Sequence, residues 1–258
     1  MAGKIKTANV YSLKGEVVKT LALPSVFQTS YRPDVIKKAV VASEANKRQP
    51  YGPSKMAGMR HSVKTWGKGR GVARVQRLAQ GRHAAESPNN VTGRRAHPPK
   101  PEKDWSQKVN KKERILAKRS ALAAVADEEM VRGRGHKFDD AVSLPLVIED
   151  GLEGITATKD VVELLEVLGL GYDLDRAKDG KRIRAGRGTM RDRKYKVPRS
   201  VLLVVGDDDV PLFKGASNLT GVEVVSARGL NASLLAPGGD AGRLTVFSES
   251  ALRRVGEW

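Results

Sequence analysis

The chain has 258 residues, of which 40% are hydrophobic, so it can build one large domain or two small ones around a real core. It carries 47 Lys and Arg against 29 Asp and Glu, a formal net charge of +18, which favours a polyanionic partner such as nucleic acid. It has no cysteine, no two histidines at ligand spacing and no apolar run long enough to cross a membrane, which argues against disulfides, iron–sulfur clusters, metal sites and membrane spans.

The first elements are expected to form a β-hairpin followed by a helix. Residues 5–11 and 16–23 have strand-like β-branched content and flank the turn-like sequence SLKG. The sequence PDVIKKAVVASEANK then begins with Pro33 at a first-turn position and repeats apolar residues at helical spacing. Residues 1–20 lack the apolar block of a signal peptide, so we expect a cytoplasmic protein.

Residues 55–109 interrupt this pattern. They contain one leucine, no isoleucine and no phenylalanine, and glycines and prolines break every helical or strand period. Such a segment cannot form its own core and is ordinarily disordered or functional. Between Lys47 and Arg119 there are 20 Lys and Arg but only four acidic residues. We therefore expect an extended basic loop here.

After the loop, the sequence predicts a helix and then alternating strands and helices. Asn110 and Glu113 resemble a capping box for a helix with an apolar face of Ile115, Leu116, Leu122, Ala123 and Ala126. A second helix, TKDVVELLEVLG, is expected to have Thr158 as its cap and Gly169 as its stop. Short apolar strands are expected at residues 144–149, 201–205, 222–227 and 244–248.

This alternation predicts an α/β fold with a mostly parallel sheet flanked by helices. We expect one globular domain over residues 1–258, interrupted by the loop of residues 55–109. A second basic loop is expected at residues 181–199, which hold nine Lys and Arg and one acid, Asp192. The rest of the chain is mildly acidic, so the charge is segregated rather than spread for solubility.

The sequence TWGKGRGVARVQR, residues 65–77, has two functional interpretations, a phosphate-binding loop for a nucleotide and a contact with nucleic acid. Its glycines partly match a phosphate-binding loop, but neither the strand–loop–helix context of a dinucleotide fingerprint nor a Gly-Lys-Ser/Thr ending is present. A plain flexible loop is a further alternative. The charge density favours nucleic acid, and RNA over duplex DNA, because Trp66 can stack on an exposed base while Arg and Lys neutralise phosphates.

Several acidic residues are expected to be polar turns without chemistry. GDDDVP, residues 206–211, follows a predicted strand, but no histidine or second acidic cluster completes a site. We interpret Asp139, Asp140, Asp173 and Asp175 in the same way. No catalytic, metal-binding or cofactor-binding residue is therefore expected.

Several stretches together resemble the family of universal large-subunit ribosomal protein four (L-four), in its archaeal and eukaryotic branch. They are TWGKGRGVARVQR and GRRAHPPK in the long loop, KRSALAA in the next helix, RAGRGTMRDRKY in the second loop, and LLAPGGDAGRLTVFSESALRR near the end. The resemblance implies a globular domain on the outside of the large subunit and a long loop threaded into ribosomal RNA. It also implies that the loop tip, around residues 66–77, lines the peptide exit tunnel beside ribosomal protein twenty-two and the nascent peptide.

The leading hypothesis is a structural protein of the large subunit that binds rRNA, supports assembly and catalyses nothing. The alternative is an RNA-modifying enzyme with a Rossmann-like core, which would need a nucleotide or methyl-donor site. The residues expected to bind RNA are Lys55, Arg60, Lys64, Trp66, Gly67, Lys68, Gly69, Arg70, Gly71, Arg74, Arg77, Arg82, Arg94, Arg95, His97, Lys100, Lys103, Lys111, Lys112, Arg182, Arg184, Arg187, Arg191, Arg193 and Lys194.

Overall fold

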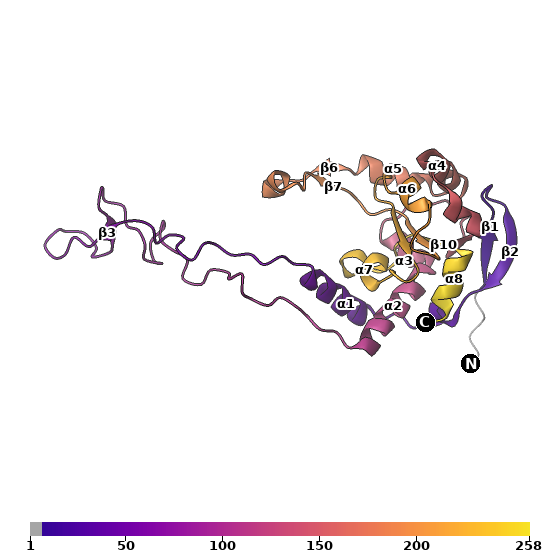
Figure 1. The fold of residues 1–258 in the computed structure, drawn as a ribbon, viewed down its shortest axis with the longest axis horizontal. Coiled ribbons are helices and arrows are strands. Elements are labelled where there is room, and N and C mark those ends of the chain that lie inside the picture. Colours follow the sequence, from indigo (N-terminus) through magenta and orange to yellow (C-terminus); the bar gives the residue numbers. More distant parts are fainter. Residues whose placement is uncertain (1–6) are drawn as a thin grey trace. The chain divides into compact units, whose positions relative to one another are not determined.

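The computed structural model describes residues 7–258, and their contacts divide the chain into two units. The first, here called the body, comprises Met1–Glu44 and Gln107–Trp258. The second, here called the extension, is Ala45–Ser106. The predicted hairpin strand at 5–11 begins two residues outside the described part. Figure 1 shows the elements of both units.

The body is built on a six-stranded sheet in the order β2-β1-β5-β10-β8-β9. Strands β1 and β2 form the antiparallel hairpin that the sequence predicts, and the other neighbours are parallel. The prediction of an α/β fold with a mostly parallel sheet is confirmed. The strands are β1 (Thr7–Tyr11), β2 (Val17–Ala22), β5 (Leu146–Ile148), β8 (Leu202–Val205), β9 (Glu223–Ser226) and β10 (Thr245–Ser248).

Each face of the sheet packs on its own hydrophobic core, because side chains alternate along the strands. Val147 and Phe247 belong to one core, whose edge-to-face pair Phe27–Phe247 has ring centroids 5.8 Å apart. Ile148 and Val246 belong to the other. The first core is covered by η1 (Ser25–Gln28), α1 (Pro33–Asn46), α2 (Lys111–Val125), α7 (Ala232–Leu235) and α8 (Glu249–Gly256). The second is covered by α3 (Glu128–Gly133), η2 (Asp150–Gly154), α4 (Thr158–Val167), α5 (Gly171–Asp179) and α6 (Leu212–Ala216).

The start of α2 differs from the prediction. Asn110 occupies the N-cap position, but its side chain makes no capping hydrogen bond. Glu113 instead accepts from Lys38 Nζ at 2.9 Å, so an ion pair with α1 replaces the expected capping box. Likewise α4 begins at Thr158 itself, with Ala157 at the N-cap and no side-chain cap.

The predicted apolar face of α2 is correct only at Leu122, and small residues make up most of the face that is buried. Ile115 is 39% exposed, and Leu116, Ala123 and Ala126 are only half-buried. Ser120 is fully buried and accepts from the backbone N–H of Arg32 at 2.7 Å. The buried face consists of Ala117, Ser120, Ala121, Leu122, Ala124 and Val125.

Asp173 is a buried anchor in α5 rather than the polar turn that the sequence indicates. Its carboxylate is fully buried; His136 Nδ1 lies 3.1 Å from Oδ1, Arg176 Nε donates to Oδ1 at 2.8 Å, and Ser200 Oγ donates to Oδ2 at 2.6 Å. Burial alone would raise the pKa of this carboxyl, but the hydrogen bonds from His136, Arg176 and Ser200 outweigh it and hold the pKa well below its ordinary value. Arg176 also donates to the backbone oxygen of Arg199 at 2.7 Å. The network therefore joins the two chain segments that lead into and out of residues 181–199.

Asp173→Asn should destabilise the body by about 3–5 kcal/mol, because the amide removes the buried charge and replaces one of its two acceptor oxygens by a donor that faces other donors. The lowered pKa sets the pH dependence: the stabilisation is complete above the unfolded-state pKa of about 3.9 and is lost as the pH falls through the lower folded-state pKa. Urea unfolding at pH 7 and at lower pH measures this. A wild-type advantage that failed to shrink below about pH 4 would contradict the assignment.

The body should fold without the extension, because neither core contains a residue of Ala45–Ser106. Replacement of residues 49–106 by a short Gly/Ser linker should leave a single cooperative unfolding transition, measured by circular dichroism. Broad or absent unfolding in this variant would show that the extension supports the body.

Candidate nucleic-acid interface

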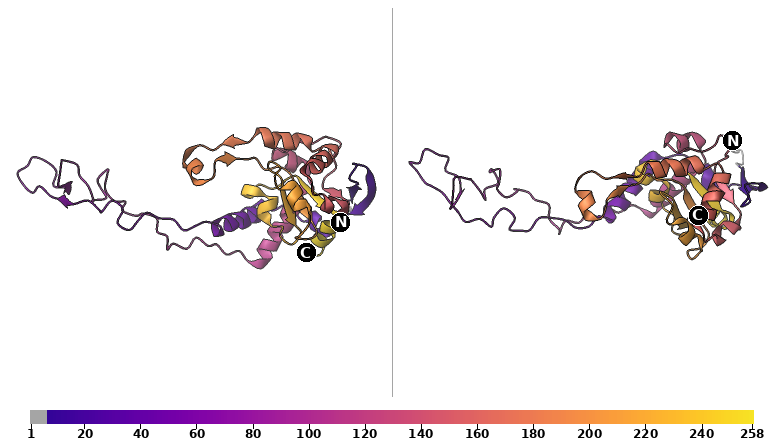
Figure 2. Two further views of the ribbon diagram at one scale, coloured as in Figure 1. Left: turned by 45° about the horizontal axis from the view of Figure 1, so that its top comes forward. Right: turned by 90° about the horizontal axis from the view of Figure 1, so that it is seen from above.

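Residues 181–199, here called the basic hairpin, are a two-stranded element that follows α5 (Figures 1 and 2). Strand β6 (Arg182–Ile183) pairs antiparallel with β7 (Tyr195–Lys196), and the 3-10 helix η3 (Gly186–Arg191) closes the end. Gly186 and Asp192 adopt left-handed φ angles of 78° and 57° on either side of the closing turn. Gly188 permits the close approach of the Arg184 side chain, whose Cδ would lie 2.6 Å from an added Cβ.

The basic hairpin presents cations without neutralising them. Arg182 lies directly opposite Lys196 in the register, and such like-charged cross-strand pairs are destabilising in an isolated hairpin. No cation between Arg182 and Lys196 belongs to an ion pair within residues 7–258. Apolar side chains are exposed beside them, with Met190 at 84% and Ile183 at 64%. This combination suits an element that is covered by a polyanion.

The extension has almost no apolar interior and is held by close backbone approaches. Ala85 is the only buried side chain of residues 45–106. A Cβ added at Gly52 would lie 2.7 Å from Pro99 O, and one added at Gly58 would lie 2.7 Å from Arg94 Cα. The outgoing and returning chain segments of the extension, here called its two strands although they are not β-strands, therefore meet at positions where a side chain would not fit.

An aromatic and cationic cluster joins the two strands near the ends of the extension. The rings of Tyr51 and Trp105 stack with centroids 6.0 Å apart and planes at 15°. The Arg48 guanidinium lies 4.5 Å from the Trp105 ring centroid, and Lys103 Nζ lies 4.2 Å from it. Sequence analysis did not identify Arg48, Tyr51 and Trp105. The sequence does show an aromatic residue close to cations at each end of the basic segment. It does not show that Tyr51 and Trp105, which are 54 residues apart, stack on each other.

The tip of the extension is a small hairpin that carries an open glycine loop. Strand β3 (Val63–Lys64) pairs with β4 (Arg77–Leu78). Between them, Gly67, Gly69 and Gly71 have positive φ angles of 74°, 78° and 65°, and no atom lies within 4 Å of a Cβ added at any of them. The loop connects two strands and precedes no helix, unlike a phosphate-binding loop of a nucleotide enzyme.

Arg77 organises this tip. Its guanidinium lies 5.5 Å from the Trp66 ring centroid and donates to the backbone oxygens of Arg82, at 2.5 Å, and Ala73, at 3.2 Å. Its side chain therefore has protein partners, whereas we expected it to pair with phosphate. Trp66 remains 37% exposed, so part of its ring is available for stacking.

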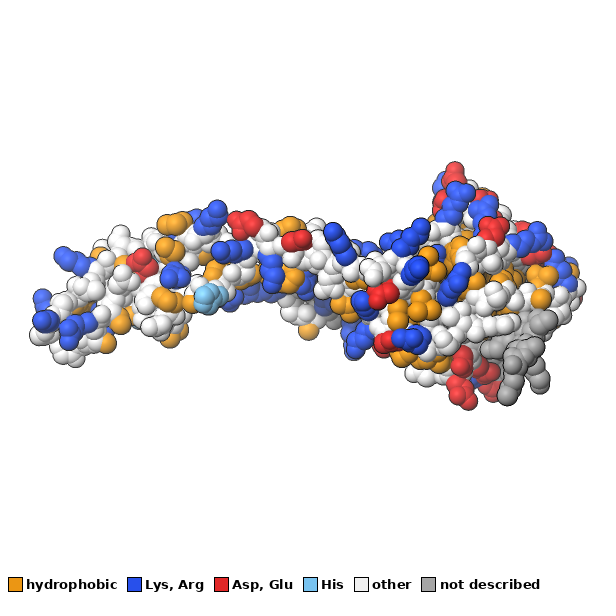
Figure 3. Space-filling view, turned by 90° about the horizontal axis from the view of Figure 1, so that it is seen from below, with side chains coloured by type: hydrophobic (Ala, Val, Ile, Leu, Met, Phe, Trp, Pro, Cys, Tyr) orange, Lys and Arg blue, Asp and Glu red, His pale blue; other side chains and the backbone are white. Residues whose placement is uncertain are grey.

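The structure places the predicted RNA-binding residues in three groups. Lys55 through Lys103 lie in the extension, Lys111 and Lys112 lie at the start of α2, and Arg182 through Lys194 lie in the basic hairpin. All of them are exposed except Arg77 and Arg94, which are half-buried. Figure 3 shows Lys and Arg side chains along the whole extension, with few acidic ones among them.

The carboxyl edge of the sheet is occupied by internal contacts. Glu153 Oε1 accepts from the Gly206 N–H at 2.8 Å and from the hydroxyls of Ser248 and Ser250 at 2.7 Å each. Asp207, in the GDDDVP turn, pairs with Arg254 at 2.7 Å. Within residues 7–258 no group of three or more His, Cys, Asp and Glu could hold a metal, and no helix is long and apolar enough to cross a membrane.

Comparisons with known proteins agree with this arrangement. The sequence model of the Ribosomal protein L4/L1 family matches residues 21–258. The chain is 51% identical over 251 residues to the large ribosomal subunit protein uL4 of Archaeoglobus fulgidus, covering 97% of this chain and 98% of the relative. It is also 51% identical to the uL4 proteins of Methanococcoides burtonii (96% and 97% covered) and Methanocaldococcus jannaschii (97% and 98%). The chain belongs to the Ribosomal protein L4/L1 family.

Proposed function

We propose that this protein is a structural component of the large ribosomal subunit that binds rRNA through the extension and the basic hairpin. The relatives are named as proteins of the large ribosomal subunit, and we assign this chain to the same particle in the cytoplasm. Their names do not favour the alternative of an RNA-modifying enzyme. The prediction of a non-enzymatic protein agrees with those names. The observation that carries the binding proposal is the concentration of exposed cations on two segments that contribute nothing to the hydrophobic cores.

Counterion release supplies the driving force. Exposed Arg and Lys side chains displace condensed cations when they contact phosphates, and each contact adds to the salt dependence of binding. The like charges of Arg182 and Lys196, which repel each other in the free hairpin, are then screened by one polyanion. RNA binding thereby stabilises the hairpin that presents the charges.

The extension suits a role in assembly. With only Ala85 buried among residues 45–106, its conformation gains little from apolar burial, so RNA contacts add stability that the few internal contacts of the extension do not supply. We further propose that its tip, residues 66–77, lines the peptide exit tunnel beside ribosomal protein twenty-two. The open glycine loop supports this, because no protein atom lies within 4 Å of a Cβ added at its three glycines, so a partner can approach the backbone closely.

Binding to large-subunit RNA should weaken steeply with salt, and the basic hairpin should carry part of that dependence. Replacement of Arg182, Arg184, Arg187, Arg191 and Arg193 by Gln should reduce the log–log slope by up to about 3.5–4.5, because each lost phosphate contact removes about 0.7–0.9. Filter binding over a salt series measures the slope. A matched variant that neutralises exposed body cations (Lys14, Lys37, Lys159, Lys214 and Arg228) should leave it nearly unchanged. Equal slopes for the hairpin variant and wild type would rule out the hairpin as an RNA element.

Substitution of Gly67, Gly69 and Gly71 by Val should impair incorporation into large subunits or elongation, measured in purified particles. Val is strained at the positive φ of these positions, but the free body should keep its stability within about 0.5 kcal/mol, because all three glycines lie in the extension, which contributes no residue to either core. ATP or NAD should not raise the melting temperature.

A second variant shows whether the Val substitutions act by straining the backbone or by adding a Cβ where RNA approaches. Asn tolerates positive φ but adds the same Cβ, so Gly→Asn at the three positions should also impair assembly if RNA approaches the backbone closely. Normal assembly of the Asn variant would limit the role of these glycines to their φ angles. A nucleotide-induced rise in the melting temperature would favour the enzyme alternative instead.

A further inference from the structure

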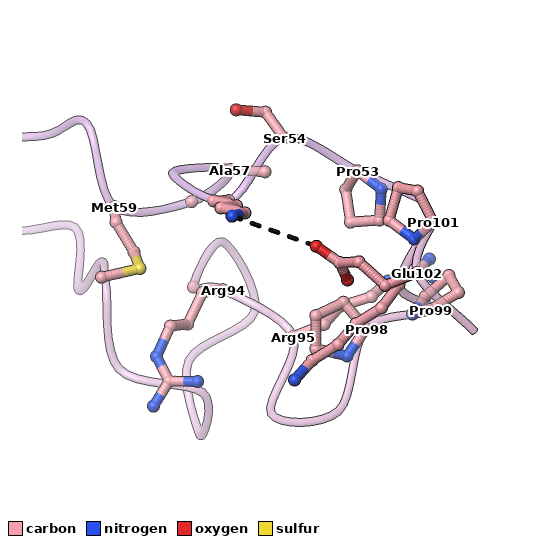
Figure 4. Close-up of a pocket in the computed structure, with 14 residues that line it drawn as sticks. Pro53, Ser54, Ala57, Met59, Arg94, Arg95, Pro98, Pro99, Pro101 and Glu102 are labelled. Carbon is pink, nitrogen blue, oxygen red and sulfur yellow. Dashed lines mark ion pairs between the residues drawn. The ribbon is translucent and has the colours of Figure 1, made fainter. Parts of the chain in front are cut away.

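The extension contains a pocket that neither the tip nor the basic hairpin explains. It lies between residues 53–59 on one strand and 93–102 on the other, and its volume is about 890 Å³ (Figure 4). This volume is within the range of pockets that hold small ligands, and it is ample for one nucleotide removed from a base stack.

Backbone contacts fix the two walls of the pocket. Gly52 packs against Pro99 and Pro101 at one end, and Gly58 packs against the backbone of Arg94 at the other. A tight turn shapes each wall: the Ala57 N–H donates to Ser54 O at 3.0 Å, and the Lys103 N–H donates to Lys100 O at 3.2 Å. The width of the pocket is thus set by contacts that leave no room for a side chain.

The lining combines rigid apolar surface with cations. The rings of Pro53 and Pro101 lie together at one end, and the flexible Met59 side chain lies at the other (Figure 4). Lys55, Arg94, Arg95 and Lys100 contribute positive charge. The rigid apolar surface of the proline rings can pack against the face of a base, and the cations suit the phosphates on either side of it.

Glu102 is the only acid that lines this pocket, and it has no strong partner there. Its Oε1 lies 4.0 Å from Lys55 Nζ, and the two side chains are 65% and 92% exposed, which makes the ion pair weak. Phosphates would repel this carboxylate, whereas a ligand group that donates hydrogen bonds would complement it. An ionised carboxylate only accepts, and a base edge can supply donors.

We propose that the pocket binds one unpaired guanine of large-subunit RNA, with Glu102 reading its Watson–Crick edge. Guanine presents two adjacent donors, N1–H and the N2 amino group, that match the two carboxylate oxygens, whereas the Watson–Crick edges of adenine and cytosine each present one amino group as donor. The proline rings and Met59 contact the base, and Lys55, Arg94, Arg95 and Lys100 contact the neighbouring phosphates. This inference rests on the proposed RNA-binding function and gives it a base-specific element.

The test measures binding of the full-length protein to fluorescein-labelled U7, U3GU3, U3AU3 and U3CU3 by fluorescence anisotropy at one salt concentration. Wild type should bind U3GU3 about tenfold more tightly than U7, the discrimination expected of one bidentate base contact. Glu102→Gln should abolish this preference, because the amide replaces one of the two acceptors by a donor. Glu86→Gln, which removes the same charge from the extension outside the pocket, should keep the preference and strengthen binding to all four oligomers equally.

Two results would overturn the guanine site: equal affinities of wild type for the four oligomers, or a preference that survives Glu102→Gln. If the heptamers do not bind while intact large-subunit RNA does, the guanine site is wrong and the proposed function stands. Failure of the wild-type protein to bind either the heptamers or large-subunit RNA would remove both.

Discussion

The structure depends on one electrostatic constraint: a cation that is already neutralised within the protein is not available to a polyanionic partner. Both cores of the body consist of its own apolar residues. The fully buried Arg243 pairs within the body, with its Nη1 2.5 Å from Glu223 Oε2. Most cations of the extension and the basic hairpin stay exposed, with Arg77 and Arg94 half-buried, on segments that contribute no residue to either core. This segregation is the reason why a strongly basic chain can have a mildly acidic body.

The extension illustrates how such a segment keeps a defined path without a core. Its 62 residues bury one side chain, so apolar burial contributes little to ordering it. Glycines at Gly52 and Gly58 instead let the two strands touch directly, and the Tyr51–Trp105 stack joins them near their ends. Each of these contacts costs no charge, so the cations remain available. The same contacts also create the pocket around Glu102, since two strands that meet at separate points enclose space between them.

Sequence reasoning predicted the elements whose signal is local and missed those that depend on distant partners. The strands were recognisable because short apolar runs between turns have few alternatives, and they confirm the predicted mostly parallel sheet. The capping box at Asn110 failed because Lys38, far away in the sequence, pairs with Glu113. The face of α2 failed because Ser120 is buried through a bond to Arg32, which no apolar pattern encodes. In the extension, composition indicated the basic segment, but the pairing of Trp66 with Arg77 and of Tyr51 with Trp105 required the fold.

The two basic segments are held in place by different kinds of contact. The basic hairpin is short, so a small change at its base would displace every one of its cations. It is accordingly fixed by a buried charge network, in which Asp173 binds Arg176 before the hairpin and Ser200 after it. Burying a carboxylate is costly unless its oxygens are hydrogen-bonded, as both oxygens of Asp173 are. The extension is instead held together by internal contacts, in which Gly52 and Gly58 let its outgoing and returning segments touch. A buried hydrogen-bond network thus defines the base of the short segment, and close backbone contacts define the register of the long one.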